Sequence, residues 1–284
     1  MTVRNPLRRL WQGLATVTGL RALGFFIPYR YAATVRAEPY RALEPVFKAA
    51  EPRMRSLFKS IETHAGVLAG FEGPPPEPKI EQNWFARLDA AAAYAMVRHR
   101  RPRHIVEIGS GHSTRFMARA VKDEGLATAI TCIDPAPRAA ILGLALNHIP
   151  KVLAEADVSV FETLGPGDIL FIDSSHIAMP GTDVDRLFGD VLPRLPVGVA
   201  VHIHDIVLPD AYPQSWTWRG YNEQLAVACL LQGGFELLWS SHWVASRHGD
   251  WIEAGPVAEI PKRVEVMETS IWLEKRRSAS TTQS

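Results

Sequence analysis

Cysteine is scarce in this chain, and its placement is informative. The 284 residues include two cysteines, Cys132 and Cys229, which lie far apart and each within an apolar run. A framework of disulfides is therefore excluded, and free buried thiols are expected. Because such thiols are typical of a reducing compartment, we predict a cytoplasmic protein.

An excess of charge of one sign is also absent. The chain has 31 lysines and arginines against 30 aspartates and glutamates, a formal net charge of +1. Proteins that hold nucleic acid through a general electrostatic attraction carry a large positive excess or a basic face. We therefore expect a small-molecule substrate and no nucleic-acid partner.

Long apolar runs are missing as well. The most apolar stretch near the start, residues 11–27, is interrupted by Gln12 and Arg21, whereas a membrane-spanning helix needs about 20 apolar residues. Charge is uneven here, since residues 1–60 hold eleven basic and three acidic residues. We predict an amphipathic segment that either docks on the body of the protein or makes peripheral contact with a membrane.

Proline marks the first boundary in the chain. Residues 73–78 read Gly-Pro-Pro-Pro-Glu-Pro, which is incompatible with a helix and is typical of an extended connector. We predict a basic helical segment with this connector over residues 1–80 and a catalytic domain over 81–275. The composition of residues 276–284 predicts a disordered tail.

Short apolar runs alternate with helix-like segments after residue 100. Strands are predicted at 105–108, 129–133, 168–172 and 199–203, and helices at 84–99, 113–121, 137–146, 184–192 and 222–231. Two more runs, 235–240 and 270–273, are predicted to close one edge of the sheet. This pattern indicates an α/β fold with a doubly wound, mainly parallel sheet. Ligands of such sheets bind beyond the carboxyl ends of the strands.

The strongest local motif is a strand that runs into a Gly-x-Gly turn and then a helix. Glu107 lies in the strand, and Gly109, Ser110 and Gly111 form the turn. Glycines allow a sharp turn and close approach to a ligand, and the following helix offers free N–H groups. Asp134 ends the next strand, where a carboxylate can accept the ribose hydroxyls of a nucleoside. A dinucleotide site would have a third glycine at Thr114, so that interpretation is less favoured.

At these residues the chain resembles the class I S-adenosylmethionine-dependent methyltransferases. Glu107, Gly109 and Gly111 match the family's first motif, Asp134 matches its ribose-binding acid, and Ser113 replaces its usual third glycine. Within this class, the chain most resembles bacterial small-molecule O-methyltransferases that act on sugars and macrolides. The resemblance, over roughly residues 80–275, implies a seven-stranded Rossmann-like sheet and S-adenosyl-L-methionine as cofactor. The predicted cofactor residues are Glu107, Gly109, Ser110, Gly111, Ser113, Asp134 and Asp173.

Carboxylates and imidazoles gather after two later strands. Asp173 and His176 follow the strand at 168–172, and His204 and Asp205 end the strand at 199–203. Neighbouring strands would place these four side chains together. Histidine titrates near neutrality, so His176, and after it His204, are the candidate bases for a hydroxyl proton, with Asp173 orienting one of them. His202, two residues earlier, is interpreted as a hydrogen-bonded core residue.

The same cluster could bind a divalent metal ion. In metal-dependent O-methyltransferases of this fold, carboxylates after the fourth and fifth strands hold Mg²⁺, and Asp173 and Asp205 resemble them. Nearby imidazoles favour Mn²⁺ or Fe²⁺ as alternatives. The predicted metal ligands are Asp173, His204 and Asp205, although Ile206 stands where the family often has Asn or Asp.

An acceptor site is predicted in the loop after the fifth strand. Residues 209–224 are dense in aromatic and amide side chains, which suit a sugar, polyol or aromatic ring. The predicted substrate residues are Tyr212, Trp216 and Asn222, with Trp84 closing the site from the other side.

Two other functions stay open at this point. The first is a metal-dependent oxygenase that uses His176, His204 and Asp205 as a two-histidine, one-carboxylate set. The second is a non-catalytic scaffold that keeps the fold and binds a partner through residues 1–60. Methyl transfer to a small molecule, at a hydroxyl oxygen, accounts best for the glycine turn and the acidic residues together.

Overall fold

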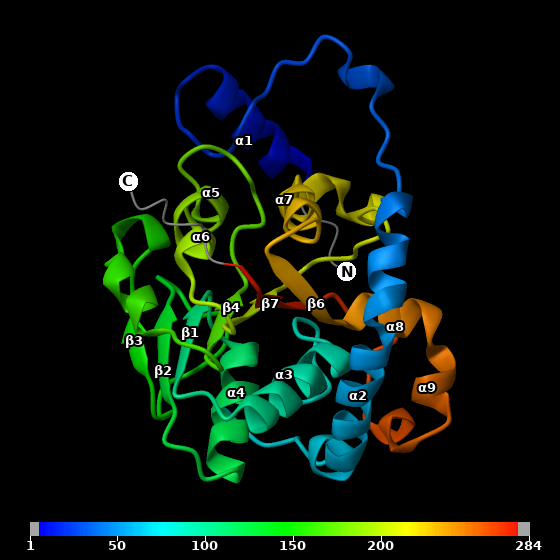
Figure 1. The fold of residues 1–284 in the computed structure, drawn as a ribbon. Helices are drawn as coiled ribbons and strands as arrows, with labels where there is room; N and C mark the ends of the chain where they lie inside the picture. Colours follow the sequence, from blue (N-terminus) through cyan, green and yellow to red (C-terminus); the bar gives the residue numbers. More distant parts are fainter. Residues whose placement is uncertain (1–5, 278–284) are drawn as a thin grey trace, which may run out of the picture. The chain divides into compact units, whose positions relative to one another are not determined.

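The computed structural model describes residues 6–277 and divides the chain into two compact units, residues 1–38 and residues 39–284 (Figure 1). The described part of the first unit contains helix α1, Pro6–Val17, and a short 3₁₀ turn, Ala32–Thr34. The boundary differs from the one predicted at residue 80. Helix α2, Glu44–Ala69, packs its buried face on α3 and β6 and so belongs to the second unit.

The second unit is built on one seven-stranded sheet with the order β3-β2-β1-β4-β5-β7-β6. Neighbours from β3 to β5 pair in parallel, and β7 is antiparallel to both β5 and β6. The predicted doubly wound, mainly parallel, Rossmann-like fold is confirmed. The strands are β1 His104–Ile108, β2 Ala129–Ile133, β3 Asn147–Ile149, β4 Ile169–Ile172, β5 Ala200–Ile203, β6 Phe235–Ser240 and β7 Ile271–Lys275.

Helices cover both faces of this sheet, as Figure 1 shows with α3 and α4 below the strands and α5 to α7 above them. The helices of the second unit after α2 are α3 Arg87–Arg100, α4 His112–Asp123, α5 Asp183–Arg186, α6 Leu192–Arg194, α7 Glu223–Leu230, α8 Ser241–Arg247 and α9 Gly249–Glu253. Strands β4 and β5 are buried along their whole length. Burial on both faces explains why their sequences are apolar except at His202, rather than alternating between apolar and polar residues.

Three sequence predictions differ from the structure. Residues 137–146 form turns instead of a helix, and the backbone N–H of Arg138 donates to Ser110 O, which ties the segment to the glycine turn. The short edge strand β3 follows and was not predicted. Cys132 is buried as expected, but Cys229 is exposed, because its side of α7 faces solvent. Within the predicted tail, Arg276 pairs with Glu236, and residues 278–284 lie outside the described residues.

Candidate active site

The register of the sheet brings the predicted site residues to one edge. Ile108 of β1 pairs with Ile172 of β4, which pairs with Ile203 of β5. The next residues continue the ladder, since Asp173 N donates to Ile108 O and His204 N donates to Ile172 O. Residues far apart in sequence therefore meet beyond the carboxyl ends of three neighbouring strands.

Glycine is required at the first turn by close packing. Gly109 has a φ of +77°, and a Cβ there would lie 2.1 Å from the carbonyl oxygen of Asp173. Gly111 has a φ of +153°, and a Cβ there would lie 3.1 Å from Ala139 N. A side chain at Gly109 would push the β1 turn away from the β4 turn, so this glycine joins the two halves of the site.

Glu107 stabilises the turn from inside. Its buried carboxylate accepts hydrogen bonds from Ser113 Oγ and Thr114 Oγ1, each at 2.6 Å, and Thr114 Oγ1 accepts one from Gly111 N at 2.8 Å. Burial raises the pKa of Glu107 to about 7, against the lowering effect of the two hydroxyl donors. Thr114, which stands where a dinucleotide site would have its third glycine, therefore links the turn to the buried acid Glu107.

Asp134 lies at the end of β2 and faces the same turn. Its Oδ2 accepts hydrogen bonds from Ser110 N at 2.6 Å and Ser110 Oγ at 3.1 Å, and its Oδ1 accepts one from Ala136 N at 2.7 Å. A carboxylate has about four acceptor positions, so capacity for further donors remains. Nearby, the Arg138 guanidinium lies 4.5 Å from the ring centroid of the half-exposed Trp84.

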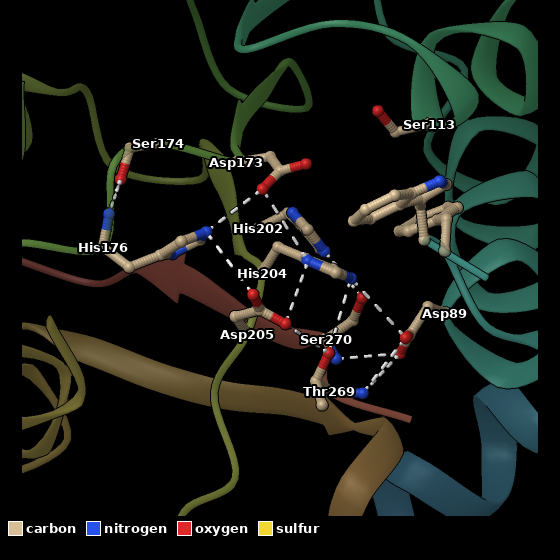
Figure 2. A network of polar contacts seen from close by, with 12 residues as sticks. Asp89, Ser113, Asp173, Ser174, His176, His202, His204, Asp205, Thr269 and Ser270 are labelled. Carbon is tan, nitrogen blue, oxygen red and sulfur yellow. Dashed lines mark hydrogen bonds and ion pairs between the residues drawn. The ribbon is translucent and has the colours of Figure 1, made fainter. Parts of the chain in front are cut away.

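Four side chains converge at the ends of β4 and β5 (Figure 2). His176 Nε2 lies 3.3 Å from Asp173 Oδ1 and 3.7 Å from Asp205 Oδ2. His204 Nδ1 lies 3.8 Å from Asp173 Oδ1 and 3.6 Å from Asp205 Oδ1. Each imidazole thus faces both carboxylates, as the sequence predicted for this group.

A further carboxylate supports each histidine from behind. His176 Nδ1 lies 2.9 Å from Oε2 of Glu223, which is fully buried at the start of α7. His204 Nε2 lies 3.7 Å from Oδ2 of the buried Asp89 in α3. Asp89 also accepts hydrogen bonds from the backbone N–H groups of Thr269 and Ser270, which fixes its position. Both rings are therefore oriented by residues outside the strands that carry them.

These contacts set the protonation of the cluster. Burial would lower the pKa of His204, but Asp205, Asp173 and Asp89 outweigh it and raise the pKa to about 9. Burial acts likewise on His176, and hydrogen bonds to Asp173 and Glu223 raise its pKa well above the usual value. The pKa of Asp173 is lowered because the nearby imidazoles outweigh the opposite effect of burial. These shifts favour protonated imidazoles at His176 and His204 beside an ionised Asp173.

His202 shows the contrast on the same strand. It is fully buried, stacks on Phe171 with ring centroids 3.6 Å apart, and its Nε2 lies 2.8 Å from Ser270 Oγ. Burial lowers its pKa well below the usual value, with the His204 charge adding to that effect. The prediction of a hydrogen-bonded core histidine is confirmed.

Two of the clustered residues have an uncommon backbone conformation. His176 has a φ of 61° and Asp205 a φ of 54°, in the left-handed region that non-glycine residues enter rarely. Such conformations persist only where surrounding contacts enforce them, and they concentrate at functional sites. Both residues lie at adjacent strand ends, so this edge of the sheet is the candidate active site.

Aromatic side chains from the loop after β5 border the cluster. The His176 ring centroid lies 4.6 Å from that of Tyr221, and the Arg219 guanidinium lies 4.1 Å from the Trp216 ring centroid and 3.2 Å from Asp205 Oδ2. The hydroxyl of Tyr212 is buried, makes no well-aligned hydrogen bond within residues 6–277, and lies near the backbone of Gln224. Such a buried hydroxyl beside charged groups is a candidate contact for a polar ligand.

Hydrogen bonds anchor this loop at both ends. Asn222 Oδ1 accepts from Ala178 N at 2.6 Å, and Asn222 N donates to His176 O. Gln224 Oε1 accepts from Val207 N, and Gln224 Nε2 donates to Asp210 O. The side-chain oxygen of Asn222 thus holds the backbone of Ala178, and the predicted contact of Asn222 with substrate stays a prediction.

No group of three or more His, Cys, Asp and Glu side chains is arranged to hold a metal ion in the part of the chain that the structure describes, residues 6–277. The predicted ligands Asp173, His204 and Asp205 do lie together, but at ion-pair distances. A protonated imidazole is not a metal ligand, so binding would first require loss of a proton.

Sequence reasoning missed several residues that the structure places at the site: Asp89, Arg138, Arg219, Glu223 and Thr269. Asp89 left a signal, because it is an acid in an otherwise apolar run of α3. Glu223 left a weaker one, in the first turn of α7. The contacts of both span many residues of sequence and depend on the final packing.

Comparisons with known proteins were consistent with this geometry. Residues 106–206, from β1 to the turn after β5, match a family of methyltransferase domains. This match confirms the resemblance to class I methyltransferases over the part that carries the glycine turn and the histidine cluster. No curated protein sequence matches the chain.

Several solved structures share parts of the architecture. A methyltransferase of Podospora anserina bound to S-adenosylhomocysteine is 15% identical, with a TM-score of 0.44 over 89% of this chain and 100% of its own. The O-methyltransferase TomG from Streptomyces achromogenes, in complex with S-adenosylmethionine, is 16% identical with a TM-score of 0.40, over 78% and 89%. The structure described as cmcI-D160 with Mg and S-adenosylmethionine is 18% identical, with a TM-score of 0.35 over 51% and 60%. Because these values are low, the strand order of this chain itself defines the fold.

Proposed function

Since residues 106–206 match a methyltransferase domain, we propose that this protein transfers the methyl group of S-adenosylmethionine to a hydroxyl oxygen of a small molecule. One observation carries the proposal. The glycine turn touches Asp173 at Gly109, and Asp173 in turn faces His176, so a nucleoside-binding element and an acid–base cluster share one edge.

The residues of the first turn fit the proposed cofactor. Asp134 retains acceptor capacity for ribose hydroxyls, and Ser110 and the Gly111 backbone present a small, polar surface beside it. Arg138 and Trp84 border the same side. Asp173, one third exposed at its side chain, offers negative charge that suits a sulfonium cation. Ser113 and Glu107 act indirectly, since they bond to each other beneath the turn.

The bound cofactor would supply a methyl group on a sulfonium, which is already an activated electrophile. The remaining work falls to this chain's residues, which must aim an acceptor hydroxyl and take up its proton. Neutral His176 accepts that proton at Nε2, and the positive ring that results is stabilised by Asp173, Asp205 and Glu223. His204 holds the two aspartates in place from the opposite side.

The resting protonation of the cluster has a direct consequence. The raised pKa of His176 favours its protonated form before ligands bind, and the imidazole becomes a base only after it loses that proton. A sulfonium cation beside Asp173 would offset part of the carboxylate charge and thereby lower the pKa of His176. Cofactor binding and activation of the base are coupled in this scheme.

The acceptor class follows from the loop after β5. Tyr212, Trp216 and Tyr221 form an aromatic wall beside His176, and the buried hydroxyl of Tyr212 can pair with a polar group. Aromatic faces with few polar groups suit a sugar, polyol or phenolic ring. Assistance by Mg²⁺, Mn²⁺ or Fe²⁺ stays a prediction, and so does an oxygenase that uses the same histidines.

The test is calorimetric titration of metal-stripped protein with S-adenosylmethionine, repeated with Mg²⁺, Mn²⁺ and Fe²⁺ added separately. We expect saturable binding without metal. Asp134→Ala should weaken binding at least tenfold, because a hydrogen bond to a carboxylate contributes about 1.5–3 kcal/mol. Asp250→Ala, which removes an exposed carboxylate from α9, is the matched control. Absence of binding by the unaltered protein under every condition would overturn the proposal.

A further inference from the structure

The N-terminal unit presents an amphipathic helix whose apolar face is exposed. In α1, Leu7, Leu10, Trp11, Leu14 and Val17 recur at helical spacing, and Arg8, Arg9, Gln12 and Thr16 occupy the opposite face. The exposed fractions are 60% for Leu10, 52% for Trp11, 57% for Leu14 and 60% for Val17. A helix of a soluble domain normally buries such a stripe, so the exposed side chains of α1 suggest an interaction surface.

The segment after α1 continues the same character. Phe25, Phe26, Ile27, Tyr29 and Tyr31 are each more than half exposed, at 54% to 66%. The Arg30 guanidinium lies 5.5 Å from the ring centroid of Tyr31. Aromatic rings with a polar or charged neighbour are typical of the interface between lipid headgroups and hydrocarbon.

Charge in this unit is mainly positive, and within residues 6–38 the single acidic residue is Glu38, at the end of the unit. Residues 6–37 contain no acidic residue, and their basic residues are Arg8, Arg9, Arg21, Arg30 and Arg36. Each of these arginines is exposed. A two-fold interface repeats the same patch on both sides, so a second copy of the chain seated through residues 6–37 would offer these arginines no acidic partner from its own residues 6–37. An anionic surface complements both the charge and the apolar stripe.

From these features we infer that residues 6–37 bind peripherally to an anionic lipid bilayer, with the apolar face of α1 in the interface and the arginines on the headgroups. No helix within residues 6–277 is long and apolar enough to cross a membrane, so the contact lies on the surface. Several arginines near a negative leaflet each add to the attraction, which salt weakens. This inference is independent of the methyl-transfer reaction.

Flotation of the full-length protein with lipid vesicles tests the inference. One set of vesicles contains phosphatidylcholine alone, and the other contains phosphatidylcholine with about 30% phosphatidylglycerol. We expect at least tenfold stronger partitioning onto the anionic vesicles, and loss of most of it in high salt. Equal partitioning onto both sets, or none onto either, would overturn the inference.

Two double variants separate the contributions. Trp11→Ser with Leu14→Ser removes the apolar face, and Arg8→Gln with Arg9→Gln removes charge from the same helix. We expect each to lower partitioning at least fivefold. The matched controls, Leu142→Ser with Val264→Ser and Lys151→Gln with Arg263→Gln, change exposed residues of the second unit and should partition like the unaltered protein.

Light scattering without lipid examines the competing occupant. If the protein dimerises in the micromolar range and Trp11→Ser with Leu14→Ser abolishes the dimer, the apolar face belongs to a second copy and the inference is wrong. A monomer that binds anionic vesicles supports it. All variants lie at exposed positions, so the unfolding midpoint of the second unit is expected to be shared by every protein compared.

Discussion

The two halves of the site solve different problems with different chemistry. At the ends of β1 and β2, buried or half-buried carboxylates are matched by hydroxyl and backbone N–H donors, as Glu107 is by Ser113 and Thr114. At the ends of β4 and β5, carboxylates are matched by imidazoles, as Asp173 and Asp205 are by His176 and His204. The first half fixes the shape of the proposed cofactor site. The second half holds the groups that we propose take up and release a proton.

This difference predicts which substitutions should abolish cofactor binding and which should change only the reaction rate. The first half depends on the tightly packed backbone of the glycine turn, so one added methyl group can disrupt the site. The second half depends on ion pairs between histidines and carboxylates. Variants of these residues should fold and bind cofactor but differ in the rate of methyl transfer and in its pH dependence. The following predictions are ordered from the largest expected effect to the smallest.

Gly109→Ala should have the largest effect. The added Cβ would lie 2.1 Å from the carbonyl oxygen of Asp173, which is backbone and cannot rotate away. We expect loss of measurable S-adenosylmethionine binding by calorimetry, with or without loss of folding by circular dichroism. Gly125→Ala is the control, because its φ is also positive, +61°, but no atom lies within 4 Å of the added group. Wild-type affinity in Gly109→Ala would contradict the role given to the first turn.

His176→Ala should affect turnover and not binding. General-base assistance typically contributes 100- to 10,000-fold, so the rate constant for methyl transfer should fall within that range. The dissociation constant of the cofactor should change less than threefold. Both are measured with the same acceptor, and His99→Ala, an exposed histidine of α3, is the control. A variant that loses binding and turnover equally would place His176 in the first half of the site.

The stability of the protein should fall as the pH rises toward 9, through His204. Its pKa in the folded protein, about 9, is above the usual 6.5, so the imidazolium stabilises the fold fully below pH 6.5 and progressively less up to the folded pKa. The difference corresponds to roughly 3 kcal/mol. Urea unfolding at pH 6 and pH 9.5 should show a smaller decrease for His204→Gln than for the unaltered protein. Parallel curves for the two would refute this assignment.

Glu223→Gln should give the smallest of these effects. The carboxylate helps to raise the pKa of His176, so its loss should move the rising limb of kcat/KM to lower pH and lower the maximal rate about tenfold, since the base is weaker. Glu253→Gln, at an exposed position of α9, should leave the profile unchanged. A lower rate without any shift of the limb would indicate a purely structural role for Glu223.

The sequence predicted the arrangement of the residues at the ends of β1 and β2 better than the arrangement at the ends of β4 and β5, for a physical reason. Glu107, Gly109, Gly111 and Asp134 belong to one βαβ unit, in which local turn chemistry and strand ends determine the geometry. Asp173, His176 and His204 were also foreseen, because parallel strands end at a common edge. The carboxylates that support these histidines were not predicted. Asp89 comes from α3 and Glu223 from α7, and no short sequence motif indicates how those helices pack on the sheet.

Errors in the fold prediction have a similar origin. The segment 137–146 has few features that distinguish a helix from turns, and its contact with Ser110 decides the outcome. The exposure of Cys229 depends on which side of α7 faces the sheet. In both cases a tertiary contact overrides a weak local preference.

In the proposed function, the anchoring of the loop after β5 separates the residues that contact the acceptor from the residues that carry the acid–base chemistry. Asn222 and Gln224 fasten its far end to residues 178 and 207, and Gln224 also holds Asp210 near its start. The residues between these fastenings, 211–218, can therefore be replaced as a cassette while His176 and Asp205 keep their positions. Under the proposed function, exchange of this segment would change the acceptor while the groups that act on the acceptor stay in place.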